Sequence, residues 1–169
     1  RILKLMNRKY TAAEYLRKVK LLRKYVPDCQ LTTDIMVGFP TETEEDFRAT
    51  LSLVREAGFS TAFTFVYSRR SGTAAAKMEG QIPESVQKER IMRLVELVNE
   101  QTREKSACYR GKTIEILCED YDEKKGLYLG RDEYGRMGYF RSEKSRIGEF
   151  VRLKIGETSG VSLMGEPAD

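Results

Sequence analysis

The sequence predicts an α/β fold followed by an all-β fold, with the change after residue 110. In residues 1–110, amphipathic helical patterns alternate with short β-branched runs, an order typical of parallel strands joined by helical crossovers. After residue 111, five short alternating runs are separated by glycines and charged turns, which indicates a small β-barrel of the OB kind. We therefore expect two domains, residues 1–110 and 111–169.

The composition limits the possible functions of the 169 residues. A hydrophobic share of 40% and a charged share of 33% are typical of a globular protein, and no apolar run is long enough to span a membrane. We expect a cytoplasmic protein without a membrane partner. The absence of histidine excludes Ser-His and Cys-His nucleophiles and most zinc sites. Because the chain begins at Arg1 without a signal peptide, we expect it to be a fragment.

The cysteines and the charges allow two further expectations. Cys29, Cys108 and Cys118 show no C-x-x-C spacing, so we expect buried or half-buried thiols in a reducing compartment. Residues 1–30 hold nine Lys or Arg and only two acidic residues. This basic segment could contact phosphate or form a solvated helix face, and on charge alone we favour the solvated face.

The first predicted element is a helix. Thr11 and Glu14 have the spacing of a capping box, so a helix should begin directly after Thr11. Its expected core stripe consists of Tyr15, Val19, Leu22 and Val26. Pro27 should end it.

The rest of the first domain is organised around residues 31–47. Residues 31–37 read as a buried parallel strand interrupted by Asp34, and Gly38-Phe39-Pro40 should stop this strand in a turn. Thr43, followed by acidic residues, predicts the start of a helix. In parallel folds, ligands bind beyond the carboxyl ends of the strands, so this turn marks a candidate site.

The elements that follow complete the α/β pattern. The second helix should bury Phe47, Leu51 and Val54 and end at Gly58, and residues 61–67 read as a second strand. In the loop over residues 68–78, Arg69 and Arg70 could bind a carboxylate or phosphate or be solvated. A long helix from about residue 82 to residue 108 suggests packing rather than chemistry.

The expected barrel strands lie at residues 113–118, 126–130, 136–140, 149–155 and 161–164. Such barrels often bind RNA through basic and aromatic side chains. The candidates for RNA contact are Lys112, Arg131, Arg136 and Arg141. The net charge of this segment, with ten Lys or Arg against twelve acidic residues, argues against a strong electrostatic binder.

Four strings occur in one order along the chain: LKLMNRKYT, TTDIMVGFPTETEEDF, FTFVYSRRSGTAAAKM and the final barrel. This ordered set resembles the methylthiotransferases of the radical S-adenosylmethionine (SAM) superfamily. The MNRKYT and FTFVYS runs are most similar to the MiaB branch, which modifies tRNA, rather than to the branch that modifies a ribosomal protein. The resemblance implies the last part of a radical SAM partial (β/α) barrel followed by a TRAM barrel.

The resemblance implies the addition of a methylthio group to C2 of an N6-isopentenyladenosine beside the anticodon. It implies SAM and 4Fe-4S clusters as cofactors. The implied partners are the tRNA anticodon stem-loop and the remainder of the protein's own chain. The C-x3-C-x2-C motif of the family is absent from these residues, so we expect no catalysis from this segment alone. An RNA-binding module without catalysis and a protein-modifying methylthiotransferase stay open as alternatives.

Residue roles also follow from the resemblance, and none is catalytic or metal-binding. SAM contacts are implied for Arg8, Asp34, Val37, Gly38, Phe39, Pro40, Phe65, Val66 and Tyr67. Contacts to the target nucleotide are implied for Ser68, Arg70 and Thr73. The chain departs from the family at Thr41, where glycine is usual, and at Arg69 and Ser71, where proline is frequent.

Overall fold

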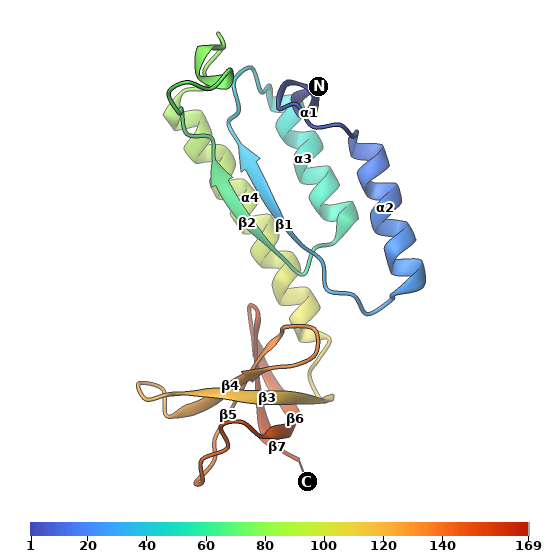
Figure 1. Ribbon diagram of the computed structural model, residues 1–169, viewed down its shortest axis with the longest axis vertical. Coiled ribbons are helices and arrows are strands. Elements are labelled where there is room, and N and C mark those ends of the chain that lie inside the picture. Colours follow the sequence, from blue (N-terminus) through green and yellow to red (C-terminus); the bar gives the residue numbers. More distant parts are fainter. Residues whose placement is uncertain (169) are drawn as a thin grey trace. The chain divides into compact units, whose positions relative to one another are not determined.

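The computed structural model describes residues 1–168, and its chain divides into two compact units (Figure 1). The first unit is Arg1–Gln101, and the second begins at Thr102. A helix and strand unit followed by a closed β-barrel confirms the predicted fold class. The domain boundary expected after residue 110 stays a prediction.

The first unit begins with two helices, α1 (Ile2–Leu5) and α2 (Ala12–Tyr25). The capping box before α2 is confirmed, because the Thr11 hydroxyl accepts from the Glu14 N–H and the Glu14 carboxylate accepts from the Thr11 N–H. The predicted core stripe is wrong at its end, since Leu22 and Val26 are exposed. The helix packs against the core through Tyr15 and Leu16 in its first half, which leaves its last turns uncovered.

Two parallel strands form the sheet of this unit, β1 (Thr32–Val37) and β2 (Thr61–Val66). Between them lies α3 (Glu44–Ala57), which begins with a second capping box at Thr43 and ends at Gly58 in the left-handed conformation. The core consists of Val37, the buried face of α3, Phe59 and three residues of α4 (Glu84–Ala107). Both helices cover one face of the sheet, as Figure 1 shows.

The loop between β2 and α4 contains a single turn of 3-10 helix, η1 (Ala75–Lys77). The turn after β1 contains two positive φ angles, 74° at Gly38 and 67° at Thr41. Thr41 is β-branched, so it adopts the left-handed region at a cost that glycine would not carry. The departure from the family pattern at this position therefore coincides with backbone strain.

The second unit is a closed barrel with strand order β3-β4-β5-β7-β6. Its strands are β3 (Thr113–Asp122), β4 (Leu127–Arg131), β5 (Met137–Phe140), β6 (Phe150–Ser159) and β7 (Ser162–Pro167). Only β5 and β7 pair in parallel, and the others are antiparallel. Alternate residues of β3 and β6 fill the interior, including Ile116, Cys118, Val151 and Leu153.

Candidate functional site

The carboxyl ends of β1 and β2 bring several of the predicted cofactor contacts together. The Tyr67 N–H donates to the Val37 carbonyl over 2.9 Å, so the residues that follow both strands lie side by side. The Phe39 ring meets the Tyr67 ring edge-on, with 5.4 Å between centroids. Pro40, in the turn after β1, is fully buried. The predicted adenine side of the site is therefore a packed turn with fixed geometry.

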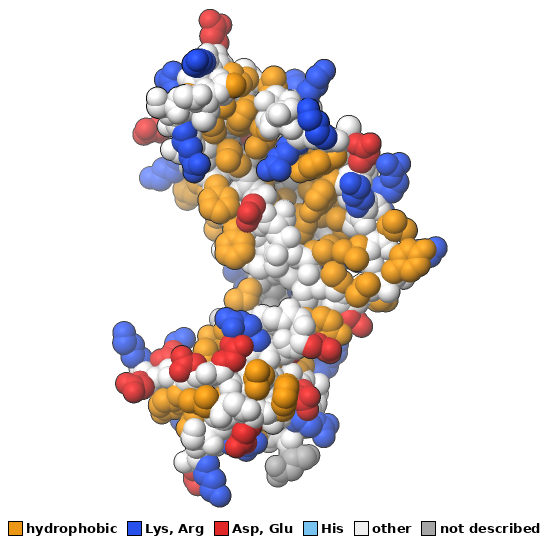
Figure 2. All heavy atoms as spheres, in the orientation of Figure 1, with side chains coloured by type: hydrophobic (Ala, Val, Ile, Leu, Met, Phe, Trp, Pro, Cys, Tyr) orange, Lys and Arg blue, Asp and Glu red, His pale blue; other side chains and the backbone are white. Residues whose placement is uncertain are grey.

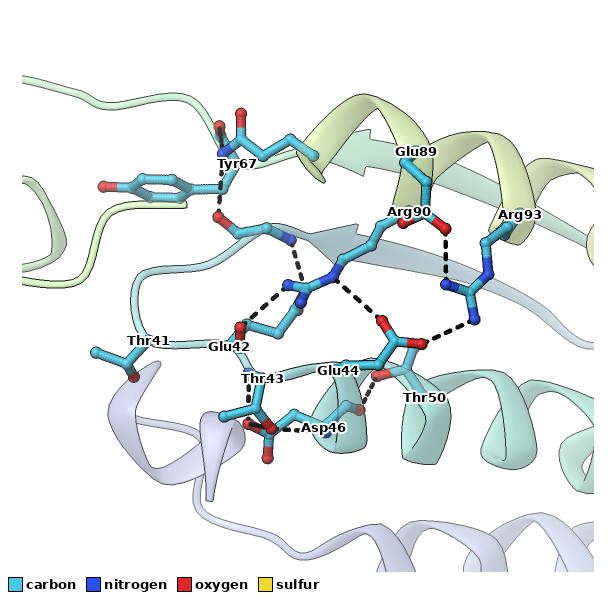
Figure 3. A network of polar contacts seen from close by, with 12 residues as sticks. Thr41, Glu42, Thr43, Glu44, Asp46, Thr50, Tyr67, Glu89, Arg90 and Arg93 are labelled. Carbon is cyan, nitrogen blue, oxygen red and sulfur yellow. Dashed lines mark hydrogen bonds and ion pairs between the residues drawn. The ribbon is translucent and has the colours of Figure 1, made fainter. Parts of the chain in front are cut away.

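Side chains rather than sheet partners bind the N–H and the carbonyl of Gly38. Figure 3 shows the polar network around Glu42 and Arg90 to which these contacts belong. Its N–H donates to Glu42 Oε1 over 3.0 Å, and its carbonyl accepts from Gln87 Nε2 over 3.1 Å. The same amide nitrogen of Gln87 lies 3.4 Å from the Tyr67 carbonyl. A Cβ at position 38 would lie 2.6 Å from Gln87 Cγ, so the close approach of this side chain requires glycine.

Glu42, which accepts from the Gly38 N–H, also forms a buried ion pair with Arg90. Arg90 Nη1 donates to Glu42 Oε1 over 2.8 Å and to the Glu42 carbonyl over 3.0 Å. The two side chains are only 6% and 4% exposed. Burial raises the pKa of the Glu42 carboxyl, against the lowering effects of the Gly38 N–H and the Arg90 guanidinium. We call Glu42, Gln87 and Arg90 the Gly38 clamp.

Further ion pairs connect Arg90 to more exposed residues of α3 and α4. Arg90 Nε lies 3.9 Å from a Glu44 carboxylate oxygen, and Arg93 donates to Glu44 over 3.0 Å and to Glu89 over 2.7 Å. The Arg93 hydrogen bond lowers the pKa of Glu44. These contacts fix α4 to the start of α3. The sequence predicts only packing for this helix, so its polar contacts to Glu42 and Glu44 are an addition from the structure.

One feature of the sequence could have pointed to the Gly38 clamp, namely the position of Arg90. Arg90 precedes Leu94 by four residues and Leu97 by seven, so it lies on the apolar stripe of α4. A charged residue on a buried stripe needs a partner, and this requirement predicts a nearby carboxylate. Glu42 lies just before the capped start of α3, where pattern analysis treats acids as favourable to the helix dipole.

Asp34 lies on the open face of the sheet, where the structure corrects one expectation. The predicted burial of its carboxylate is wrong, because Asp34 is exposed and, within residues 1–168, its side chain shows no hydrogen bond or ion pair. Its neighbours on this face are apolar: Met36 is 41% exposed, Phe63 is 61% exposed and Phe65 is 49% exposed. Hydrophobic side chains gather over the strands in Figure 2. Since α3 and α4 cover only the other face, each strand alternates instead of being buried on both sides.

The remaining predicted cofactor contacts differ in accessibility. Val37 is fully buried against α3, so only its backbone can reach a ligand. Val66 is partly open, and Arg8 is exposed in the segment after α1. The Tyr67 hydroxyl is buried without a hydrogen-bond partner among the described residues. A buried hydroxyl in this state has unused capacity to bind a ligand group.

The loop after β2 holds the predicted nucleotide contacts. Ser68 and Arg70 are exposed. Thr73 builds the loop itself, because its hydroxyl donates to the Arg70 carbonyl over 2.8 Å and accepts from the Ala76 N–H over 3.2 Å. Arg69 is exposed as well, but its Nε donates to the Ala76 carbonyl over 2.8 Å. Of the paired arginines, Arg70 is the one whose guanidinium has no hydrogen bond or ion pair within the described residues.

Arg136 of the barrel, a predicted RNA contact, takes part in a structural cluster. Its guanidinium lies 4.1 Å from the Tyr109 ring centroid and 4.7 Å from that of Tyr134, and it donates to the Tyr109 hydroxyl. It also pairs with Asp132 over 2.5 Å, and burial raises the pKa of this carboxyl. The role of Arg136 toward RNA stays a prediction.

The other barrel candidates are more accessible. Lys112 lies over the Tyr109 ring, and Arg131 pairs with Glu119 over 2.6 Å. Arg141 is exposed and has no ion pair within the described residues. Among the four candidates, Arg141 is therefore the side chain with the fewest contacts to other described residues.

Comparisons with known proteins agree with this division. Residues 1–54 match the model of the radical SAM superfamily, and residues 107–168 match that of the TRAM domain. This chain joins a radical SAM segment to a TRAM domain.

Several relatives are similar to this chain along nearly its whole length. The chain is 49% identical over 168 residues to the tRNA-2-methylthio-N(6)-dimethylallyladenosine synthase of Clostridium botulinum (strain Langeland). The proteins of the same name from Clostridium novyi and Acetivibrio thermocellus are 46% and 45% identical. Each alignment covers 98% of this chain, but only 37%, 37% and 35% of these relatives. The resemblance to methylthiotransferases is thereby confirmed.

The described residues suit one of the two implied cofactors and not the other. The radical SAM segment offers the exposed carboxylate of Asp34, the turn at Gly38 and the buried hydroxyl of Tyr67. These groups suit a ligand with hydroxyl and amine groups. A 4Fe-4S cluster needs several thiolates together. Within residues 1–168 no group of three His, Cys, Asp or Glu could hold a metal, and Cys118 lies inside the TRAM barrel. The described residues do not fit a cluster.

The three cysteines are free, but they differ in burial. Cys118 is buried, Cys29 is half-buried and Cys108 is exposed, so the expectation of buried or half-buried thiols is wrong for Cys108. No helix in the described part of the chain is long and apolar enough to cross a membrane.

Proposed function

We propose that this chain is part of a tRNA methylthiotransferase that modifies C2 of N6-isopentenyladenosine next to the anticodon by radical SAM chemistry. The observation that carries the proposal is the similarity to synthases of that name over 98% of the chain. The chain spans about 37% of the length of these relatives, so the remainder of the protein would supply the cluster ligands. Such an enzyme would act in the cytoplasm, where its tRNA substrate is found.

The radical SAM segment would bind one side of SAM. The open carboxylate of Asp34 can accept hydrogen bonds from a ribose hydroxyl or an ammonium group, and Arg8 can pair with a carboxylate. The turn of Gly38, Phe39 and Pro40, with Tyr67 beside it, would line the adenine. Phe65 and Val66 would complete that wall through their accessible surfaces. SAM, bound with a cluster, supplies the radical and the methyl group.

The TRAM barrel would bind the anticodon stem-loop. Lys112, Arg131 and Arg141 offer cations to phosphates, and the loop with Ser68 and Arg70 would meet the target nucleotide. Since C2 of a stacked adenine is not accessible, the base must leave the stack to react. The chain alone would bind RNA but would not cleave SAM, because no cluster ligand set exists within residues 1–168.

Complementation of a deletion strain with the full-length gene tests the proposal. Mass spectrometry of isolated tRNA should show that the gene restores methylthio-adenosine. Asp34→Ala should lower the level about tenfold or more, since a hydrogen bond to a charged group contributes about 1.5–3 kcal/mol. Asp28→Ala, which removes an exposed acid from the loop after α2, is the matched control and should have no effect.

The alternatives predict different results. If tRNA lacked methylthio-adenosine while a ribosomal protein gained a methylthio group, the enzyme would modify protein. If neither were modified although the protein bound tRNA, the chain would belong to an RNA-binding protein without catalysis. Either result would refute the proposal.

A further inference from the structure

We propose that the Gly38 clamp positions the cofactor wall: Glu42, Gln87 and Arg90 hold the two peptides that meet at Gly38 in the orientation that binds SAM. This inference rests on the proposed function, because it assigns a purpose to residues behind the proposed adenine wall. None of the three residues was among the predicted contacts.

The first support is the way in which Gly38 is satisfied. A residue just beyond a strand normally leaves its N–H and carbonyl to water or to a turn. At Gly38, Glu42 accepts from the N–H and Gln87 donates to the carbonyl. The N–H belongs to the peptide before the Gly38 Cα and the carbonyl to the peptide after it, so the two side chains fix the planes of both peptides that meet at Gly38. Rotation of either peptide would break one of the two hydrogen bonds.

The second support is the bridge between strands. One amide nitrogen of Gln87 reaches the carbonyls of both Gly38 and Tyr67, at 3.1 Å and 3.4 Å. These carbonyls end the two parallel strands, and the residues beside them carry the proposed adenine contacts. One side chain of α4 therefore joins the two strand ends, in addition to the backbone hydrogen bond from the Tyr67 N–H to the Val37 carbonyl.

The third support is the choice of a buried ion pair. Well-packed apolar residues in place of such a pair often leave stability unchanged or increase it. Arg90 even leaves its buried Nε without a hydrogen bond among the described residues. An apolar pair could hold α4 against the turn, but it could not offer an acceptor to the Gly38 N–H. The carboxylate supplies this acceptor, and the guanidinium favours its charged form and orients it.

The test uses the full-length protein with its clusters reconstituted without oxygen. Gln87→Met keeps the length of the side chain and removes both donated hydrogen bonds. We expect the Kd for SAM, measured by calorimetry, and the KM for SAM cleavage to rise about tenfold, while kcat changes less than about twofold. Gln101→Met is the matched control, because Gln101 also lies on α4 and donates to a backbone carbonyl, that of Arg55, far along the helix from Gly38. It should leave Kd and KM unchanged.

A pair of Glu42 variants separates positioning from stability. Glu42→Gln and Glu42→Met both remove the charge opposite Arg90, so both should lower the thermal stability. Only Glu42→Met removes the acceptor of the Gly38 N–H, so only this variant should raise Kd about tenfold. A purely structural role would change Kd equally in both variants.

The outcomes are distinct. If the unsubstituted protein binds SAM and folded Gln87→Met binds it equally well, the inference is overturned and the proposed function stands. Equal values of Kd for the two Glu42 variants would overturn it as well. If the reconstituted, unsubstituted protein does not bind SAM, both the proposed function and the inference fail.

Discussion

Replacement of Arg90 by Met should destabilise the first unit in a pH-dependent way. Met fills much of the same volume but leaves the Glu42 carboxylate, 4% exposed, without its cation. Removal of one partner of a buried ion pair costs about 3–5 kcal/mol. Glu42 can limit this cost by binding a proton. From an ordinary pKa of 4.5, protonation at pH 7 costs about 3.4 kcal/mol, at about 1.36 kcal/mol per pH unit.

The direction with pH follows from the pKa of Glu42. Burial already raises this pKa in the folded chain, so the folded state binds the proton more tightly than the unfolded state. Stability from this group is therefore greatest below pH 4.5 and declines as pH rises through the folded pKa. Without the guanidinium the pKa rises further. The loss in Arg90→Met should be about 3 kcal/mol at pH 7 and about 1 kcal/mol at pH 5.

Urea unfolding of the 169-residue chain, followed by helical circular dichroism, measures this loss. The signal reports mainly the first unit, because the second unit is a β-barrel apart from the end of α4. Arg93→Met is the control, since its guanidinium is 36% exposed and its loss should cost less than about 1 kcal/mol. A loss in Arg90→Met below about 1 kcal/mol at pH 7, or an equal loss at pH 5 and pH 7, would refute this account of the pair.

Four further outcomes are expected in the same chain. Thr41→Gly should stabilise the first unit by about 0.5–1 kcal/mol in urea unfolding. Glycine removes the strain of a β-branched residue in the left-handed region, about 1–2 kcal/mol, and this gain exceeds the cost of the chain entropy that glycine adds. A destabilised variant would contradict this reasoning. Gly130→Ala should unfold the barrel, measured by near-ultraviolet circular dichroism, since a Cβ would overlap a backbone carbonyl of β3 that cannot move aside. Arg136→Met should cost the barrel about 3 kcal/mol in a urea titration by leaving a buried carboxylate unpaired, and a loss only in tRNA affinity would assign Arg136 to RNA instead. With a thiol reagent, Cys108 should react quickly and Cys118 only on unfolding, because burial both shields this thiol and raises its pKa.

Local sequence signals predicted most of the fold. The two capping boxes at Thr11 and Thr43, and the helix end at Gly58, depend on residues within one turn of each other, so their patterns survive in any tertiary context. The barrel strands were found from alternation, although β3 and β6 extend four residues further than expected. These extensions follow bulges at residues 118–120 and 155–157, which interrupt the alternation.

The candidate site was only partly predictable, because its essential contacts are long-range. Gln87 and Gly38 are 49 residues apart, and Arg90 and Glu42 are 48 residues apart, so no local pattern joins them. The burial of Asp34 was wrong for a related reason. A run of apolar residues indicates a strand, but only the packing of α3 and α4 decides which face is covered.

The hydrogen bond from the Gly38 N–H to Glu42 also makes this amide a reporter of local opening. Its hydrogen can exchange with solvent only when the carboxylate moves away, and the carboxylate is held by a residue of α4. Hydrogen exchange at this one amide would therefore measure how often α4 releases the end of β1. An amide that exchanges as slowly as the core of α3 would mean that strand end, turn and helix open as one cooperative unit.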